Sequence, residues 1–210
     1  MPNSSKYDKI LDALLQLLEN KSIQNISVSE IAYTAGIGKG SIYYYFPSKN
    51  DIFEALIERS YKKPLETAKL LASQTNISPF TRMSMLFQAC RNSSLAFLHT
   101  HKDTLLNDAQ EDAFLHQKYL RHMITELKPE LAKIIEQAIE QGEIQFEHPK
   151  ALAEIVLIVL AVKFDNTLVP STWNEVEETI RGLIALLEKG TDNPSGSLNF
   201  LMFTQNFPEI

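Results

Sequence analysis

The chain has 210 residues, 44% of them hydrophobic, and a net charge of −6. This length fits one large or two modest domains with a buried core. One cysteine, Cys90, excludes an internal disulfide and is typical of a reducing cytoplasm, where we expect the protein to be. The longest apolar run, residues 151–164, contains Glu154 and Lys163 and is shorter than the roughly 20 residues of a membrane span, so we expect no membrane partner.

Charge is unevenly distributed along the chain. Residues 1–63 hold eight Lys/Arg and seven Asp/Glu, a net charge of +1, whereas residues 64–210 hold twelve and nineteen, a net charge of −7. A nearly neutral N-terminal part on an acidic body disfavours a protein that coats nucleic acid through general charge attraction. If the chain binds DNA, we expect a small footprint with many uncharged contacts.

The first predicted helix spans about residues 5–20. Its apolar residues recur at helical spacing and form one stripe: Ile10, Leu11, Leu14, Leu17 and Leu18. The polar stretch before it, MPNSSKYDK, does not resemble a signal peptide. We expect this helix to cover the two that follow and to complete a three-helix domain.

Two short helices joined by a tight turn are predicted next. Ser27 and Glu30 have the spacing of a capping box, which starts a helix at Val28. Gly36 ends that helix, because glycine adopts the left-handed conformation that the turn requires. The second helix spans about residues 39–46, with Ile42 and Phe46 pointing inward. A small residue at the crossing, a turn glycine and an apolar anchor predict a helix-turn-helix.

The outer face of the second helix is rich in small, hydroxyl and basic side chains. Such side chains suit a helix placed in the DNA major groove, where Ser41 can reach a base edge and Tyr or Lys can contact phosphates. The alternative is that the three tyrosines are core aromatics and Lys39 is merely solvated, but three adjacent residues cannot share one helix face. The predicted DNA-binding residues are Ser27, Lys39, Gly40, Ser41, Tyr43, Tyr44, Tyr45 and Lys49.

This segment resembles the TetR family of bacterial transcription regulators. The matching residues are Val28, Ile31, Ala32, Ala35, Gly36, Ile37, Lys39, Gly40, Ile42, Tyr43, Tyr45, Phe46, Ser48 and Lys49. Gly38 departs from the serine that the family often has, so a side-chain cap and a phosphate contact are missing there. The resemblance implies an all-helical, two-domain homodimer, usually a repressor that a small molecule releases from DNA. It does not identify the ligand.

The remaining chain reads as helices. A fourth helix follows the cap Ser48, and Pro64 kinks or restarts it. Further helices are predicted at about 79–100, 103–125, 129–141, 149–167 and 173–189, separated at prolines and glycines that include the Lys128-Pro129 step. We therefore predict an all-α fold, with a helix-turn-helix domain at 1–50, a linking helix from about 51, and a larger helical ligand-binding and dimerisation domain at 51–210.

The last two predicted helices and the tail carry an association signal. Apolar residues cover more than one face of the helix at 149–167, and a second stripe follows on the next helix. These stripes are either buried core or, in the interpretation we favour, a two-fold dimer interface of two helices per chain. The tail, residues 191–210, is apolar enough to dock on the body or on the partner subunit.

Ligand, metal and catalytic sites are less clearly indicated. The candidate lining of an apolar ligand pocket is Phe87, Cys90, Phe97, Phe114, Tyr119 and Phe164, each of which can instead be plain core. His99 and His101 fall on different faces of a helix, so we expect no metal and no cofactor. No phosphate loop, nucleophile elbow or HExxH motif is present, so we expect no enzyme.

These patterns favour a ligand-responsive regulator that binds double-stranded DNA, at a palindromic operator, as a homodimer. Repression and release by an apolar small-molecule effector are implied by the family resemblance. Two alternatives stay open: a regulator controlled by a protein partner through the apolar tail, and a helical ligand-binding dimer that no longer reads DNA.

Overall fold

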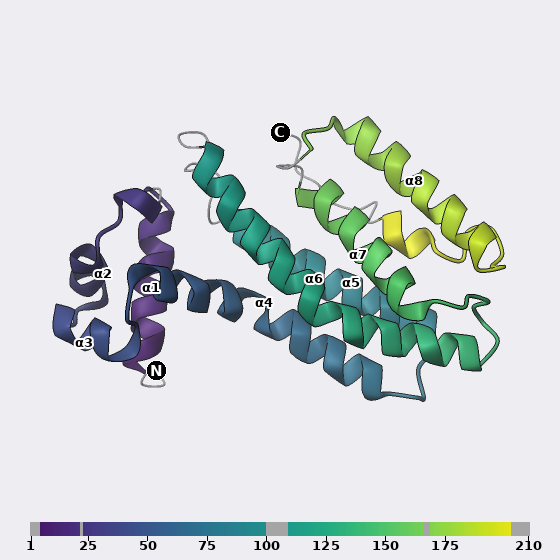
Figure 1. The fold of residues 1–210 in the computed structure, drawn as a ribbon, viewed down its shortest axis with the longest axis horizontal. Helices are drawn as coiled ribbons and strands as arrows, with labels where there is room; N and C mark the ends of the chain where they lie inside the picture. Colours follow the sequence, from purple (N-terminus) through teal and green to yellow (C-terminus); the bar gives the residue numbers. More distant parts are fainter. Residues whose placement is uncertain (1–4, 22, 100–108, 166–168, 203–210) are drawn as a thin grey trace. The chain divides into compact units, whose positions relative to one another are not determined.

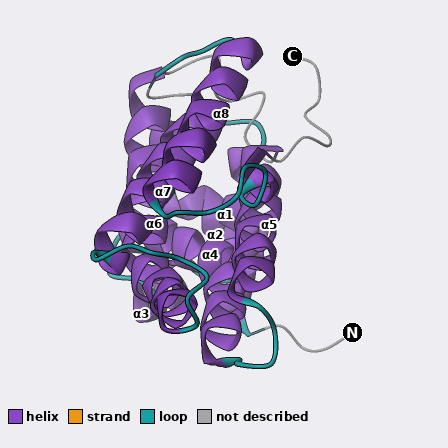
Figure 2. Cartoon of the chain, turned by 90° about the vertical axis from the view of Figure 1, so that its right-hand side faces the viewer, coloured by secondary structure: helices purple, strands orange, loops and turns teal. Residues whose placement is uncertain are grey.

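A computed structural model describes residues 5–21, 23–99, 109–165 and 169–202 (Figure 1). Figure 2 shows that these residues are helical or loop, without a strand, which confirms the all-α prediction. The helices are α1 (Lys6–Leu18), η1 (Ile23–Asn25), α2 (Val28–Ala35), α3 (Lys39–Tyr45), α4 (Lys49–Ser73), α5 (Pro79–His99), α6 (Ala109–Glu140), α7 (Pro149–Asp165), α8 (Trp173–Gly190) and η2 (Asn199–Met202).

The chain divides by its internal contacts into two compact units. The first, here unit 1, comprises the described residues up to Lys63 together with those from Cys90 to Tyr119. The second, unit 2, comprises Pro64–Ala89 and the described residues from Leu120 onward. The predicted domain boundary near residue 50 stays a prediction.

Helices α1, α2 and α3 form the N-terminal helical group, as predicted. The Ser5 side chain caps α1 by accepting from the Asp8 backbone N–H at 3.1 Å. On α1, Ile10, Leu11 and Leu14 are fully buried. Helix α1 packs on α2, and α2 packs on α3. The apolar stripe of the first helix therefore forms the core that holds the next two helices in place.

Helix α4 continues without interruption through Pro64, so that residue does not restart it. The helix begins after Ser48, whose hydroxyl oxygen accepts from the Asp51 backbone N–H at 3.3 Å. Within unit 1, α4 is held to α1 by the ion pair between Arg59 and Asp12, 2.7 Å long. The first part of α4 belongs to unit 1 with the N-terminal group, and its Ile52, Phe53 and Ile57 are buried.

The predicted break at the Lys128-Pro129 step is wrong, because α6 passes through Pro129. Proline lacks an N–H and therefore leaves the carbonyl four residues earlier, at Thr125, without its helical partner. Both Pro129 and Thr125 are exposed, so water can hydrogen-bond that carbonyl. The carbonyl that loses its helical partner can therefore bind water, and α6 continues through the proline.

A buried arginine holds the end of α4 in unit 2. Arg82 on α5 is fully buried, and its Nη1 donates to the Leu71 carbonyl at 3.2 Å, to the Gln74 carbonyl and to the Gln137 side chain. Gln137 on α6 in turn donates to the Ala72 carbonyl at 3.1 Å. Burial lowers the pKa of Arg82. The hydrogen bonds satisfy carbonyls at the end of α4 and tie it to α5 and α6.

The described part of the tail docks on unit 2. Leu198, Leu201 and Met202 are buried, and η2 packs on α8 (Figure 1). The tail was predicted to dock either on the body or on a partner subunit, and up to residue 202 it docks on the body of its own chain. Among the described residues, no helix combines the length and the apolarity that crossing a membrane requires.

Candidate nucleic-acid interface

A capping box fixes the start of α2. The Oγ of Ser27 accepts from the Glu30 backbone N–H at 3.2 Å, and the Ser27 backbone N–H donates to Glu30 Oε2 at 2.8 Å. Lys21 donates to Glu30 Oε1 at 2.6 Å. The hydrogen bond from Lys21, followed by that from the Ser27 backbone, lowers the pKa of Glu30 to about 2. The predicted capping box is therefore confirmed, and Lys21 extends it.

Replacing Glu30 with glutamine is expected to lower the melting temperature most at neutral pH. The folded pKa lies below the value of 4.5 for an unperturbed Glu, so its stabilising effect is complete above about pH 4.5 and is lost as the pH falls towards 2. Thermal unfolding of the wild type and Glu30→Gln across this range measures the difference. The variant Lys21→Met should reproduce the part of this difference that comes from Lys21. An equal difference at pH 2.5 and pH 7 would contradict the assignment.

The turn between α2 and α3 depends on one glycine. Gly36 has φ = 64° and ψ = 35°, in the left-handed region, and its N–H donates to the Tyr33 carbonyl at 3.1 Å. The N–H of Ile37 donates to the Ala32 carbonyl at 3.0 Å. The next helix begins after Gly38, which makes no side-chain cap bond. Glycine at position 38, where the tetR family often has serine, thus leaves α3 without a side-chain N-cap, as expected.

The inner side of α3 is anchored in the core. Ile42 is fully buried, and Phe46 just after the helix is nearly so. The Tyr7 ring on α1 packs on Phe46 with ring centroids 4.9 Å apart and meets the Tyr45 ring edge-on at 6.5 Å. Tyr45 therefore helps to hold α3 against α1, besides its predicted contact with DNA.

The outer side of α3 is open. Tyr44 is 84% exposed and Tyr43 49% exposed, and Lys39 and Gly40 are exposed too. A Cβ added to Gly40 would meet no atom of the chain within 4 Å, so nothing inside the fold requires glycine there. A small residue on an exposed helix leaves room for an outside surface to approach the backbone. The arrangement matches a short helix presented to a groove.

Lys49 has a structural role. Its Nζ donates to the Ile26 carbonyl at 3.0 Å and lies 3.3 Å from that of Gln24, so it holds the segment before α2 against the start of α4. Ser27, at the end of that segment, is exposed, and its contact with DNA stays a prediction. The phosphate contact of Lys49 stays a prediction, and we assign it the positioning of Ser27.

Sequence reasoning missed Tyr33. This residue on α2 is 89% exposed, more than any other large hydrophobic or aromatic side chain in the described residues. Its neighbours Ile31 and Ala32 are buried, so its position on the outer face of α2 could have been found from the helical period. We add Tyr33 to the candidate phosphate contacts.

Of the predicted ligand-lining residues that the structure describes, only Phe87 lines an apolar hollow found in unit 2, and the ligand site itself stays a prediction. Phe87 lines an apolar hollow in unit 2, whereas Cys90 and Tyr119 are buried residues of unit 1. Burial raises the pKa of the Cys90 thiol to about 12. Phe164 is half-buried and is not part of the hollow. Phe97 and Phe114 lie among residues whose side chains the structure does not describe.

Comparison with known proteins supports the same reading of α2 and α3. Residues 10–56 match the bacterial regulatory proteins of the tetR family. The probable HTH-type transcriptional regulator YttP of Bacillus subtilis is 29% identical over 147 residues, which cover 69% of this chain and 68% of that protein. The nucleoid occlusion factor SlmA of Marinobacter nauticus is 27% identical over 146 residues, covering 67% of this chain and 70% of SlmA.

The fold also resembles solved structures over most of its length. SmeT, the repressor of the Stenotrophomonas maltophilia multidrug efflux pump SmeDEF, superposes with a TM-score of 0.66 and covers 93% of each chain. Its sequence is only 14% identical, so this similarity shows the fold alone.

Proposed function

As a member of the tetR family of bacterial regulatory proteins, the chain is a DNA-binding transcriptional regulator, and we propose that it is a homodimeric repressor released from a palindromic operator by a small apolar effector. The resemblance inferred from the sequence is thereby confirmed at the level of the family. The observation that carries the proposal is the open face of α3, held in place from its inner side by Ile42 and Phe46.

Helix α3 is the part that enters the major groove in this proposal. Ser41 and Tyr44 reach base edges, and Lys39 and Tyr43 contact phosphates on either side. Gly40 lets the helix approach the DNA closely. Unit 1 needs little positive charge for this, because hydroxyl groups and backbone N–H groups make many of the contacts.

Dimerisation is proposed to occur through α7 and α8, which lie side by side (Figure 1). Ile155 on α7 is 50% exposed, Ile158 is exposed one turn later, and Leu186 on α8 is 73% exposed. The inner faces of both helices are buried, and within the described residues these three apolar side chains stay exposed. Two copies would bury these faces together, and their two-fold symmetry would match a palindromic site.

Release requires an effector that binds the conformation unable to hold DNA better than the one that does. The alternative, control by a protein partner through an exposed apolar tail, loses support for residues 198–202, because their apolar anchors are buried in unit 2. The other alternative is a ligand-binding dimer that does not bind DNA, and its support was Gly38 and the small positive charge of residues 1–63. The exposed outer side of α3 argues against this alternative.

Replacing Gly40 with alanine is expected to weaken operator binding about tenfold, which is about 1.4 kcal/mol, without loss of stability. The added methyl group meets no atom of the chain but occupies the space between helix and DNA. Fluorescence anisotropy with labelled promoter DNA measures the affinity, and urea unfolding measures the stability.

The matched control is Gly190→Ala at the end of α8, where an added Cβ also meets nothing within the chain. It should leave the affinity unchanged and should not lower the stability. If Gly40→Ala binds the operator as tightly as the wild type, α3 does not approach DNA closely and the proposed reading face is wrong.

A further inference from the structure

The chain turns back onto unit 2 after α8. Two residues in the left-handed region make this turn, Asp192 with φ = 55° and Gly196 with φ = 92°. The segment that follows ends in η2 and buries Leu198, Leu201 and Met202. Residues 194–202 are here called the C-terminal plug.

A buried carboxylate holds the C-terminal plug. Glu188 on α8 is nearly fully buried, and its Oε1 accepts from the backbone N–H of Gly196 at 2.8 Å and from that of Leu198 at 3.0 Å. A carboxylate is buried at little cost only when hydrogen bonds satisfy it. The side chain of Asn193 adds a bond to the Glu143 carbonyl at 2.6 Å, just before the plug. Glu188 therefore acts as a latch.

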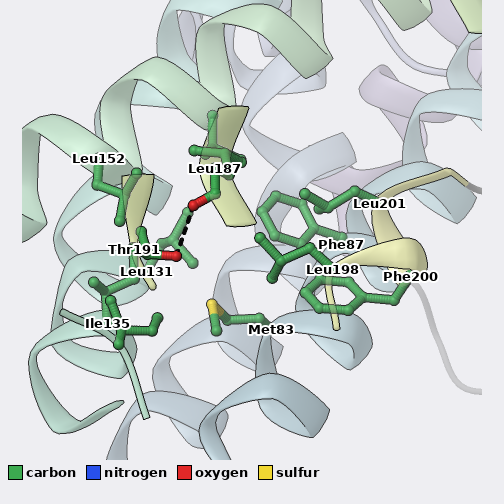
Figure 3. A pocket seen from close by; sticks show the side chains of 12 residues that line it. Met83, Phe87, Leu131, Ile135, Leu152, Leu187, Thr191, Leu198, Phe200 and Leu201 are labelled. Carbon is green, nitrogen blue, oxygen red and sulfur yellow. Dashed lines mark hydrogen bonds between the residues drawn. The ribbon is translucent and has the colours of Figure 1, made fainter. Parts of the chain in front are cut away.

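Beneath the plug lies an apolar hollow of about 30 Å³, the space of roughly one water molecule (Figure 3). Leu198, Phe200 and Leu201 line it from the plug, and Met83 and Phe87 line it from α5. The rings of Phe87 and Phe200 are stacked with centroids 6.4 Å apart. Side chains of the plug thus fill most of a larger apolar space between the helices.

Among the described residues, the one polar side chain that lines this hollow, Thr191, already has hydrogen-bond partners within the chain. Thr191 lines the hollow, but its hydroxyl lies 2.7 Å from the Leu187 carbonyl oxygen, the bond drawn in Figure 3, and 2.6 Å from Asn193 Oδ1. The remaining lining side chains are apolar. A molecule that takes the place of the Phe200 and Leu201 side chains would therefore be uncharged and apolar there.

We propose that the C-terminal plug competes with such a molecule: uncharged apolar compounds bind unit 2 by displacing Phe200 and Leu201 from the hollow. The plug is a 3₁₀ turn held by a few bonds to one carboxylate, and short 3₁₀ turns have poorer hydrogen bonds than α-helices. Segments of this kind are among the first to open locally. This inference rests on the proposed function, because the compound that displaces the plug would be the effector of the proposed repressor.

The test uses the uncharged dye N-phenyl-1-naphthylamine, titrated into the full chain without DNA. Two variants weaken the latch without changing the lining: Glu188→Gln, which removes the charge, and Gly196→Ala, which is strained at φ = 92° and places its Cβ 3.3 Å from Asn199 Nδ2. Both should bind the dye about tenfold more tightly than the wild type, because a larger fraction of molecules is open. The control Gly190→Ala should bind as the wild type does.

Amide hydrogen exchange distinguishes dye that displaces the C-terminal plug from dye that binds at another place on the protein. The N–H groups of Gly196 and Leu198 should exchange faster when the dye is bound, since their acceptor is left behind. Dye affinity unchanged in both latch variants, or unchanged protection of these two N–H groups, would overturn the proposal. Failure of operator binding would instead refute the proposed repressor and would leave these results untouched.

Discussion

Replacing Ile155 with aspartate is expected to split the homodimer and to weaken operator binding by at least about a hundredfold. The isoleucine is half exposed on α7, so the single chain tolerates a charge there. In a dimer the same charge would be buried against the partner without a counter-ion, which is strongly unfavourable. A monomer holds only one half-site and loses the gain of about 10² to 10⁴ that linked binding gives.

Sedimentation equilibrium measures the dimer, and anisotropy with promoter DNA measures the affinity. The matched control is Leu70→Asp, because Leu70 is an apolar residue on α4 in the same unit with a similar exposed fraction, 59% against 50%. The control should remain dimeric and bind the operator. If Ile155→Asp is dimeric at the concentration where the wild type is, the interface does not involve this face of α7.

Replacing Arg82 with alanine is expected to lower the free energy of unfolding by about 3 kcal/mol, since a buried bond to a charged group contributes about 1.5–3 kcal/mol and several are lost. The carbonyls of Leu71 and Gln74 would be left near the core without this donor, and a cavity would remain. Urea unfolding followed by circular dichroism gives the value.

The control is Arg121→Ala, an exposed arginine on α6, which should change the free energy of unfolding by less than about 0.5 kcal/mol. The conservative change Arg82→Lys should give a free energy of unfolding between those of Arg82→Ala and the wild type, because the lysine side chain is shorter and its ammonium falls short of the position of Nη1. An Arg82→Ala protein as stable as the wild type would show that the end of α4 is held by other contacts.

The N-terminal group was predictable because its signals are local. Ser5, Ser27 and Gly36 act on N–H or carbonyl groups within a few residues, so their effects can be recognised in the sequence itself. Ile42 and Phe46 were placed correctly for the same reason, since helical spacing alone decides which side they face. The conformation of α3 and its neighbours therefore follows from interactions between residues that are close in the sequence.

Other features depend on partners far apart in the chain. Arg82 looks like an ordinary surface residue in the sequence, yet Gln137, its partner, lies 55 residues further on. Pro64 and Pro129 both looked like possible helix ends, yet α4 and α6 pass through them, and the local sequence alone does not show this.

The predicted ligand-lining set was built from residue type, and residue type does not show which aromatics face one another. Of that set, only Phe87 proved to line the hollow in the part of the chain that the structure describes. Phe200, its partner across the hollow, comes from the tail, which was expected to dock but could not be placed.

The most direct test of the central claim is a gel-shift titration of the purified protein with DNA from its own promoter region. Two salt concentrations and a scrambled competitor of the same length are needed, with Tyr44→Ala beside the wild type. We predict saturable binding by the wild type that survives the competitor at both salt concentrations, and weaker binding by Tyr44→Ala. Binding only at low salt, equal for both DNAs and unchanged by Tyr44→Ala, would be non-specific charge attraction and would contradict operator reading by α3.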